Sequence, residues 1–230
     1  MKTVKNVVFL FIMALSLTFT ACEEDSETLN IVGKISRPTK EKPGGFTDQP
    51  GALPAPKITE KMYIPEYDLW DHTRCIAWRI EWPEYPADVN PDMIPDFFSS
   101  EYGEVYSFNF LTRTDQSNKA QMDFSLYHGN MLRSSWYNFE LWPWYEDYLA
   151  ESPRFKKIDR SLSSIEHWVT ERPDRFEKFW PSDESPPSEV SYQAGDFFLF
   201  HLGKANRYGG IRIVSETPRI IEIYYTEPNI

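Results

Sequence analysis

The sequence predicts an α+β domain built mainly from antiparallel β-sheet, either a sandwich or a sheet backed by helices, with a helical insertion in the middle. Three observations predict this class: apolar and polar residues alternate along several short runs, helix-like segments gather between residues 143 and 180, and three strands separated by turn residues close the chain. Strands interrupted by a block of helices are typical of α+β architecture.

The first predicted strands lie between residues 74 and 128. Large apolar residues alternate with smaller or polar ones from Arg74 to Trp82, as in an antiparallel strand with one buried face. Residues 83–95 contain four prolines, which predicts an irregular segment outside the centre of any sheet. Residues 104–112 and 119–128 alternate in the same way around a polar turn, and they predict a β-hairpin.

The middle of the chain is predicted to be helical. Pro143 suits the first position of one helix, which Ser152-Pro153 would end. Ser163 and Glu166 have the spacing of a capping box for a second helix. Its apolar face would be formed by Leu162, Ile165, Trp168 and Val169. A third, short helix is predicted from Asp174 to Trp180.

The C-terminal part predicts a meander of three strands: Asp196–Leu202, Ile211–Ser215 and Arg219–Thr226. The first of these strands is apolar on both faces, so we expect it to be central and covered by the helices or by a second sheet. His201, near its end, is expected to be a core residue.

The N-terminus predicts a lipoprotein signal peptide over residues 1–21. Lys2 and Lys5 precede an uncharged apolar run of 15 residues, which is short for a transmembrane helix and ends at Ala21-Cys22. A small residue directly before a cysteine is what a lipoprotein signal peptidase requires, so Cys22 would become the acylated mature N-terminus. The alternative is an ordinary secretory signal with Cys22 incidental.

The residues after Cys22 are acidic: Glu23-Glu24-Asp25-Ser26-Glu27. This stretch resembles the start of mature surface-exposed lipoproteins in Bacteroides-like Gram-negative bacteria. The resemblance implies a protein of the outer membrane that faces the medium and is held through acylated Cys22, since two or more acyl chains anchor stably. The closing strands, residues 195–229, resemble those of small mostly-β lipoproteins of the same bacteria, a group that includes haemophores. That likeness carries no functional residue across.

A change in composition separates a tether from a domain. Residues 23–57 hold five prolines, four glycines and one aromatic residue, whereas residues 58–230 hold 33 aromatic residues. We therefore expect residues 22–57 to form a flexible tether and residues 58–230 to form one globular β-rich domain.

The charge of the chain argues against nucleic acid as a partner. Asp and Glu number 35 against 24 Lys and Arg, a formal net charge of −11, and basic residues do not cluster beyond Arg154-Phe155-Lys156-Lys157. Phosphate backbones are bound through such clusters.

Cys75 is the one cysteine besides Cys22, and its apolar surroundings predict a buried, unreactive thiol.

Catalytic, metal and cofactor motifs are absent from the sequence, which lacks GxSxG, HExxH, CxxC, a glycine-rich phosphate loop and an EF-hand pattern. We therefore expect a non-enzymatic protein without a cofactor, with two alternatives. The first alternative is a haem- or metal-capturing surface lipoprotein, because His128 and Met131 flank a turn and are spaced to ligate haem iron. A surface hydrolase would need paired carboxylates, for which Asp68 with Asp71 and Glu146 with Asp147 are the nearest candidates.

The densest aromatic segment spans residues 136–148, with seven aromatic residues. Its candidate ligand-binding residues are Trp136, Trp142, Trp144 and Tyr145. Such rings stack on sugars through apolar C–H edges, so a glycan is the first candidate ligand, and an outer-membrane protein partner is the other. The alternative is that these rings pack a helix against the sheet.

The anchor assignment predicts that Cys22→Ser leaves an unprocessed or soluble form, because acylation is then impossible. Membrane fractionation after a high-salt wash measures this, with Cys75→Ser as the matched control. A Cys22→Ser protein that still sediments with outer membranes would contradict the assignment.

Overall fold

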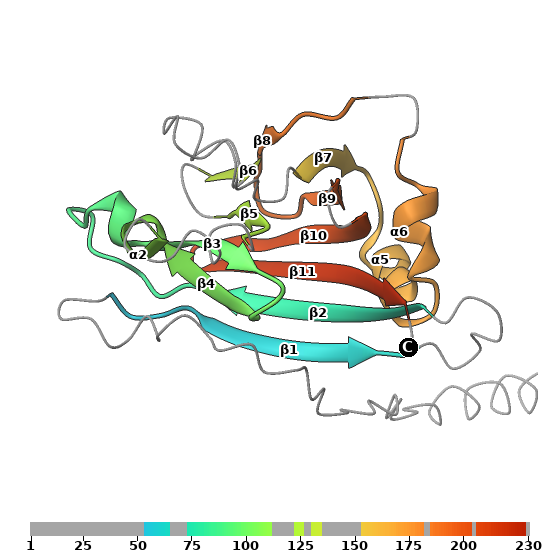
Figure 1. Cartoon of the computed structure of the whole chain (residues 1–230), viewed down its shortest axis with the longest axis horizontal. Helices are drawn as coiled ribbons and strands as arrows, with labels where there is room; N and C mark the ends of the chain where they lie inside the picture. The colour runs from blue at the N-terminus through green and yellow to red at the C-terminus, as the bar shows by residue number, and fades with distance from the viewer. Residues whose placement is uncertain are drawn as a thin grey trace, which may run out of the picture. The chain divides into compact units, whose positions relative to one another are not determined.

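The computed structural model describes residues 53–64, 73–111, 122–126, 130–134, 153–181, 185–203 and 206–228. Two antiparallel sheets pack face to face in this part of the chain, and short helices cover parts of their outer faces (Figure 1). The predicted fold class, a mainly antiparallel α+β sandwich with helices backing a sheet, is confirmed.

The first sheet has six strands in the order β1-β2-β11-β10-β9-β7, and every neighbouring pair is antiparallel. Its strands are β1 (Lys57–Tyr63), β2 (Thr73–Glu81), β7 (Pro153–Ile158), β9 (Phe197–Leu202), β10 (Arg207–Glu216) and β11 (Arg219–Pro228). The predicted C-terminal meander is confirmed, because β9, β10 and β11 are consecutive neighbours.

The second sheet has five shorter strands in the order β4-β3-β5-β6-β8. They are β3 (Pro95–Ser99), β4 (Glu104–Ser107), β5 (Phe124–Ser125), β6 (Met131–Ser134) and β8 (Glu189–Ser191). The described helical segments are η2 (Pro91–Met93), α2 (Phe108–Leu111), α5 (Leu162–Thr170) and α6 (Asp174–Lys178). Among the described residues, no helix is both long and apolar enough to cross a membrane.

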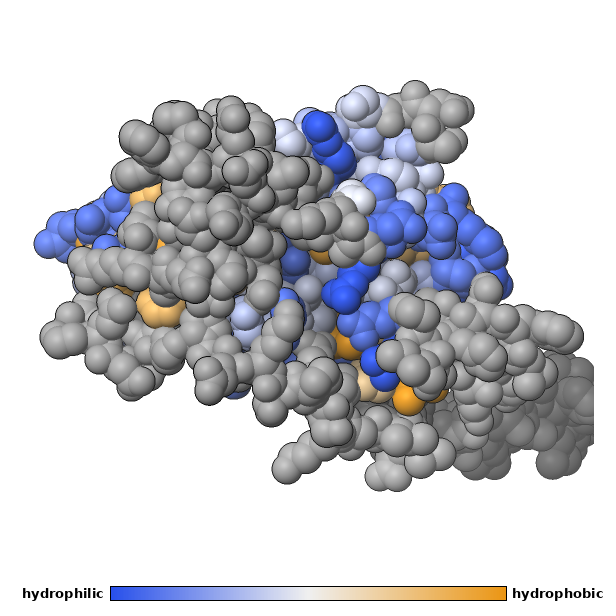
Figure 2. Space-filling view, viewed as in Figure 1, coloured by the Kyte–Doolittle hydropathy of each residue, from blue (hydrophilic) through white to orange (hydrophobic). Residues whose placement is uncertain are grey.

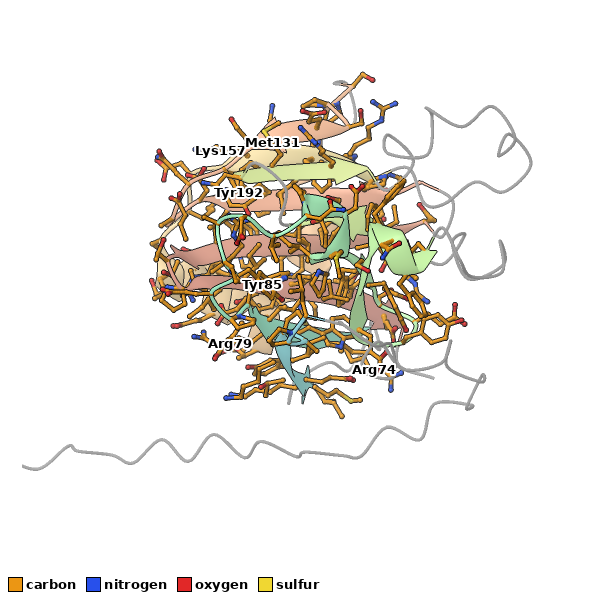
Figure 3. All side chains as sticks on the ribbon, turned by 90° about the vertical axis from the view of Figure 1, so that its left-hand side faces the viewer. Arg74, Arg79, Tyr85, Met131, Lys157 and Tyr192 are labelled. Carbon is orange, nitrogen blue, oxygen red and sulfur yellow. The ribbon has the colours of Figure 1, made fainter. Side chains whose placement is uncertain are left out.

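The main core lies between the two sheets; of the residues labelled in Figure 3, Tyr192 belongs to it and Tyr85 packs against it. Trp78 of β2 packs edge-on against Phe98 of β3 and Tyr225 of β11, with ring centroids 5.4 and 5.2 Å apart. Large aromatic rings bury much apolar area per residue, and edge-on contacts add to that burial. This core joins the two sheets through side chains from the first half and the last third of the chain.

A second core lies on the other face of the first sheet, under α5 and α6. Alternation along β9 supplies both cores: Phe198, Phe200 and Leu202 face the second sheet, whereas Phe197 and Leu199 face the helices. The prediction that this strand is interior and covered on both faces is confirmed. Cys75 is buried in the second core, and burial raises the pKa of its thiol, as expected for an unreactive cysteine.

The predicted hairpin of residues 104–112 with 119–128 is wrong. β3 lies between β4 and β5 and pairs with both, and residues 108–111 form α2 instead of extending the strand. The four prolines of residues 83–95 predicted an irregular segment, so β3 was not predicted. Pro95 is compatible with β3 because a proline is tolerated as the first residue of a strand. A tight turn with Gly103 at φ +65° then joins β3 to β4.

Three smaller expectations also need correction. Ser161 caps α5, because its hydroxyl accepts the N–H of Ser164, so the capping box at Ser163 is not formed. Leu162 is 45% exposed and does not share the buried face of the helix. His201 is only partly buried, since it lies on the helix-covered face of the sheet near the β9–β10 turn.

The strand β1 was not predicted, because its polar sequence KITEKMY leaves most side chains exposed on the sheet edge. Its register with β2 runs from Lys57 to Tyr63, and the hydroxyl of Tyr85 donates to the carbonyl of Pro54 just before it. The described contacts thus include residues that precede residue 58, the expected first residue of the domain.

The two-sided burial of β9 predicts a large cost for Leu199→Ala, about 2–5 kcal/mol of unfolding free energy, because Leu199 is 0% exposed. Leu162→Ala makes the same chemical change at a 45% exposed position and should cost about 0.5 kcal/mol or less. Denaturant unfolding of both variants measures the difference. Similar costs for the two variants would contradict the helix-covered position of β9.

Candidate functional site

The candidate site lies at the C-terminal end of α6, which the sheet holds in place through Phe176. This ring is fully buried and packs against Tyr224 and Phe197, with centroids 6.4 and 6.5 Å away. A Cβ at Gly210 would lie 2.7 Å from the Phe176 ring and 2.5 Å from the Phe197 ring. Glycine at this position therefore lets the helix sit directly on β10.

Ion pairs at the start of α6 hold the same helix. Asp174 accepts hydrogen bonds from Arg172 at 3.0 and 2.9 Å and from Lys178 at 2.7 Å. The Arg172 guanidinium, followed by Lys178, lowers the pKa of Asp174 to about 2. The carboxylate therefore stays ionised throughout the physiological pH range, and both ion pairs persist there.

Two consecutive aromatic residues, Phe179 and Trp180, directly follow α6. The N–H of Phe179 donates to the carbonyl of Arg175, and the N–H of Trp180 donates to the carbonyl of Glu177. Because successive helical residues point in different directions, the two rings join different groups of side chains. We call these groups the Trp180 cluster and the Phe179 cluster.

The Trp180 cluster comprises Trp180, His201 and Tyr208. His201 and Tyr208 are direct cross-strand partners on β9 and β10, and their rings stack with centroids 4.3 Å apart and planes at 17°. The Trp180 ring lies 5.7 Å from His201 and 6.3 Å from Tyr208. All three side chains are only partly buried, so the cluster reaches the surface.

Polar groups border the Trp180 cluster. A ring nitrogen of His201 lies 3.1 Å from the side-chain oxygen of Asn206, which occupies the β9–β10 turn with φ +48°. Partial burial, with a smaller contribution from the charge of Glu177, raises the pKa of Tyr208. Its hydroxyl therefore stays protonated and able to donate a hydrogen bond at neutral pH.

The Phe179 cluster comprises Phe179, Trp168, Arg160 and Arg175. The rings of Phe179 and Trp168 stack with centroids 4.8 Å apart and planes at 10°. The guanidinium carbon of Arg160 lies 4.6 Å from the Phe179 ring centre and 5.4 Å from that of Trp168, and that of Arg175 lies 5.9 Å from Phe179. Phe179 is 41% exposed. On the face seen in Figure 2, the described surface around α5 and α6 is mostly hydrophilic.

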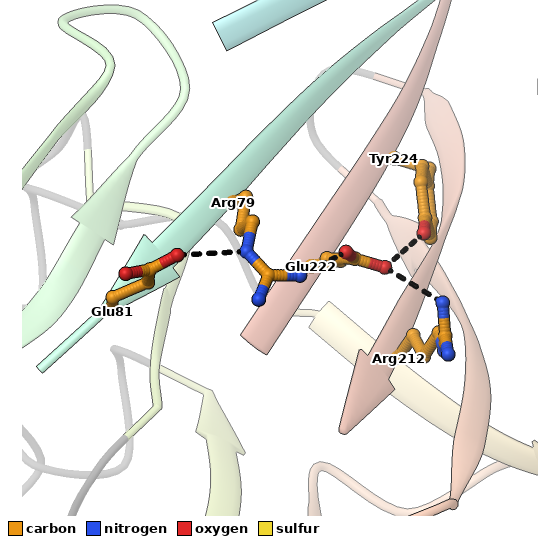
Figure 4. A network of polar contacts seen from close by, with 5 residues as sticks. All are labelled: Arg79, Glu81, Arg212, Glu222 and Tyr224. Carbon is orange, nitrogen blue, oxygen red and sulfur yellow. Dashed lines mark hydrogen bonds and ion pairs between the residues drawn. The ribbon is translucent and has the colours of Figure 1, made fainter. Parts of the chain in front are cut away.

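A polar network on the same face of the sheet has a structural role (Figure 4). Glu222 of β11 accepts from Arg79 of β2 at 2.7 Å and from Arg212 of β10 at 3.1 Å, and the Tyr224 hydroxyl donates to it at 2.6 Å. Arg79 and Arg212 are both direct cross-strand neighbours of Glu222. The network therefore links three adjacent strands through matched charges.

Two buried carboxylates of the second sheet also serve the fold. Asp123 accepts the N–H of Ser100 at 2.7 Å and the hydroxyl of Tyr225 at 2.8 Å. Asp96 accepts the hydroxyl of Ser125 at 2.6 Å and the N–H of Leu126 at 2.8 Å. Each carboxylate is held by hydrogen bonds that cross between strands, as buried polar groups require.

Most residues proposed from the sequence lie outside the described residues. This applies to Cys22, Trp136, Trp142, Trp144 and Tyr145, to His128, and to the paired acids Asp68, Asp71, Glu146 and Asp147. Met131 is described: it is partly buried in β6 and pairs with Ser191 of β8. Within the described ranges, no group of three His, Cys, Asp or Glu side chains is placed to hold a metal ion.

Sequence reasoning missed both clusters, although one signal was present. Phe179 and Trp180 are consecutive aromatics at the end of a short helix before Pro181, and two adjacent helical residues seldom both face the core. No family model, curated protein or solved structure matches the chain. The chemistry of the site is therefore argued from its own residues.

Proposed function

We propose that this chain is a lipid-anchored protein of the outer membrane surface that binds an extracellular glycan on the Trp180 cluster. The N-terminal pattern of Lys2, Lys5, an apolar run and Cys22 supports the anchor and the address. The observation that carries the binding role is the group of three partly exposed rings held between α6 and the β9–β10 turn.

The composition of the cluster fits a sugar ligand. The Trp180 ring offers an apolar face for the C–H edges of a pyranose ring, while Asn206 and the Tyr208 hydroxyl supply hydrogen-bonding groups beside it. The rings are already ordered by contacts with each other, so little side-chain freedom is lost on binding. An open surface of this kind favours recognition of part of a long polymer over enclosure of a small molecule.

The test is the retardation of the full lipidated chain, in detergent, in native gels that contain neutral soluble polysaccharides such as starch, xyloglucan or mannan. Trp180→Ala should weaken binding to a retarding polysaccharide by at least about 1 kcal/mol, since a central aromatic contact is lost. Its unfolding free energy should fall by only about 1 kcal/mol, because the side chain is partly exposed. Trp180→Phe should retain part of the affinity.

Tyr85→Ala is the control. Tyr85 is also a partly buried aromatic residue, but it packs against the core between the sheets and not against the helices. Equal weakening by Trp180→Ala and Tyr85→Ala would contradict the assignment of the site. If Trp180→Ala leaves polysaccharide binding unchanged, the ligand binds elsewhere on the protein. If the chain captures a defined outer-membrane protein and binds no glycan, the hypothesis of a protein partner is favoured.

A further inference from the structure

Two arginines of the Phe179 cluster differ from every other arginine that the structure describes. Arg160 and Arg175 contact aromatic rings, but neither guanidinium has a hydrogen bond or ion pair with another described residue. The remaining described arginines all have polar partners: Arg74 and Arg207 with Glu227, Arg79 and Arg212 with Glu222, Arg133 with Glu189, Arg154 with Pro186, Arg172 with Asp174, and Arg219 with Asn130.

The absence of carboxylate partners is unexpected in this chain. Acidic residues exceed basic ones by 35 to 24, and Asp159 directly precedes Arg160 in the sequence. Asp174 at the start of α6 already binds Arg172 and Lys178. The guanidinium groups of Arg160 and Arg175 therefore lie beside an exposed ring, and no described side chain or carbonyl accepts from their N–H groups.

The ring contacts orient these donors. A guanidinium near an aromatic face is held by a cation–π contact while its N–H edge stays available, and that edge matches the oxygens of a carboxylate or sulfate. The guanidinium carbons of Arg160 and Arg175 lie 4.6 and 5.9 Å from the Phe179 ring centre, so a ligand that packs on this ring lies beside both cations. The 41% exposure of Phe179 leaves part of its surface for an apolar contact with the same ligand.

We infer that the Phe179 cluster binds the anionic group of an acidic polysaccharide, with Arg160 and Arg175 on the charged oxygens and Phe179 against the sugar ring. This inference rests on the proposed glycan-binding function and specifies the ligand class. The shared chemistry is a planar or tetrahedral oxyanion on a hexose, either a uronate carboxylate or a sulfate ester.

The negative net charge of the chain does not prevent such binding. At physiological ionic strength, interactions between exposed charges are screened beyond about 8 Å, so the two guanidinium groups beside Phe179 outweigh distant carboxylates in the potential at that ring. Exposed acids nearer the cluster, such as Glu171 and Glu177, reduce the affinity of one site. A polymer compensates through rebinding, because it presents many anionic groups at high local concentration.

The experiment compares the full lipidated chain in detergent with three polysaccharides at 0.15 M salt: polygalacturonate, heparin and neutral dextran. The double variant R160Q/R175Q should bind the preferred acidic polymer at least tenfold more weakly. The double variant K57Q/K61Q removes the same charge from exposed positions on the edge strand β1 and should bind like the parent chain. R160K/R175K should lose most of the affinity, since an ammonium group lacks the planar fork. Thermal melts verify that each variant is folded.

The source of the anion follows from which acidic polymer binds: polygalacturonate for a carboxylate, heparin for a sulfate. Equal weakening by K57Q/K61Q, or equally tight binding of poly-glutamate, would overturn the inference. Binding of neutral polysaccharides in the gels without any binding of acidic ones would overturn the inference while leaving the proposed function in place. Failure of every polysaccharide would overturn both.

Discussion

The burial of the six-stranded sheet on both faces is the constraint on which the rest of the structure depends. Phe198 and Phe200 of β9 belong to the core between the sheets, while Phe197 and Leu199 of the same strand belong to the core under the helices. A strand of this kind needs a cover on each side, since either face would otherwise expose several large apolar side chains. The second sheet supplies one cover, and α5 and α6 supply the other.

The helical cover connects the fold to the candidate site. Phe176 seats α6 on β10 at Gly210, where a larger residue would collide with two rings, and Asp174 fixes the beginning of the helix through two ion pairs. Phe179 and Trp180 follow within one turn, so their positions are set by the packing of the helix. Rings fixed in this way contact a ligand without first being ordered, which favours binding. The site is a consequence of how the sheet is covered.

The local sequence pattern predicted the strands in which buried and exposed side chains alternate regularly. It failed for strands whose neighbours in the sheet are distant in the sequence. The alternation of apolar and polar residues over 74–82 identified β2. The run before Leu202, which is apolar on both faces, identified β9. The insertion of β3 between β4 and β5 depends on contacts with distant segments, and neither its proline nor its short length indicates a strand. The polar edge strand β1 carried too little periodicity to be recognised.

The same distinction applies to the site. The stacking of His201 on Tyr208 follows from the register of the β9–β10 hairpin, but the approach of Trp180 depends on how α6 packs against the sheet. Sequence reasoning placed the ligand on residues 136–148 because aromatic residues are densest there, and that hypothesis stays a prediction. Density along the chain is a weaker indicator of a binding surface than rings that tertiary packing holds together at the surface.

The most direct measurement of the central claim is a ¹H–¹⁵N spectrum of the eight tryptophan indoles in the full chain, titrated with the polysaccharide that retards it most in native gels. The account predicts that the Trp180 signal shifts, with a smaller shift at Trp168 beneath Phe179, while the buried Trp78 and Trp82 do not respond. Shifts at Trp136, Trp142 or Trp144 with an unchanged Trp180 signal would contradict this account. They would indicate that the ligand binds residues 136–148, as the sequence first suggested.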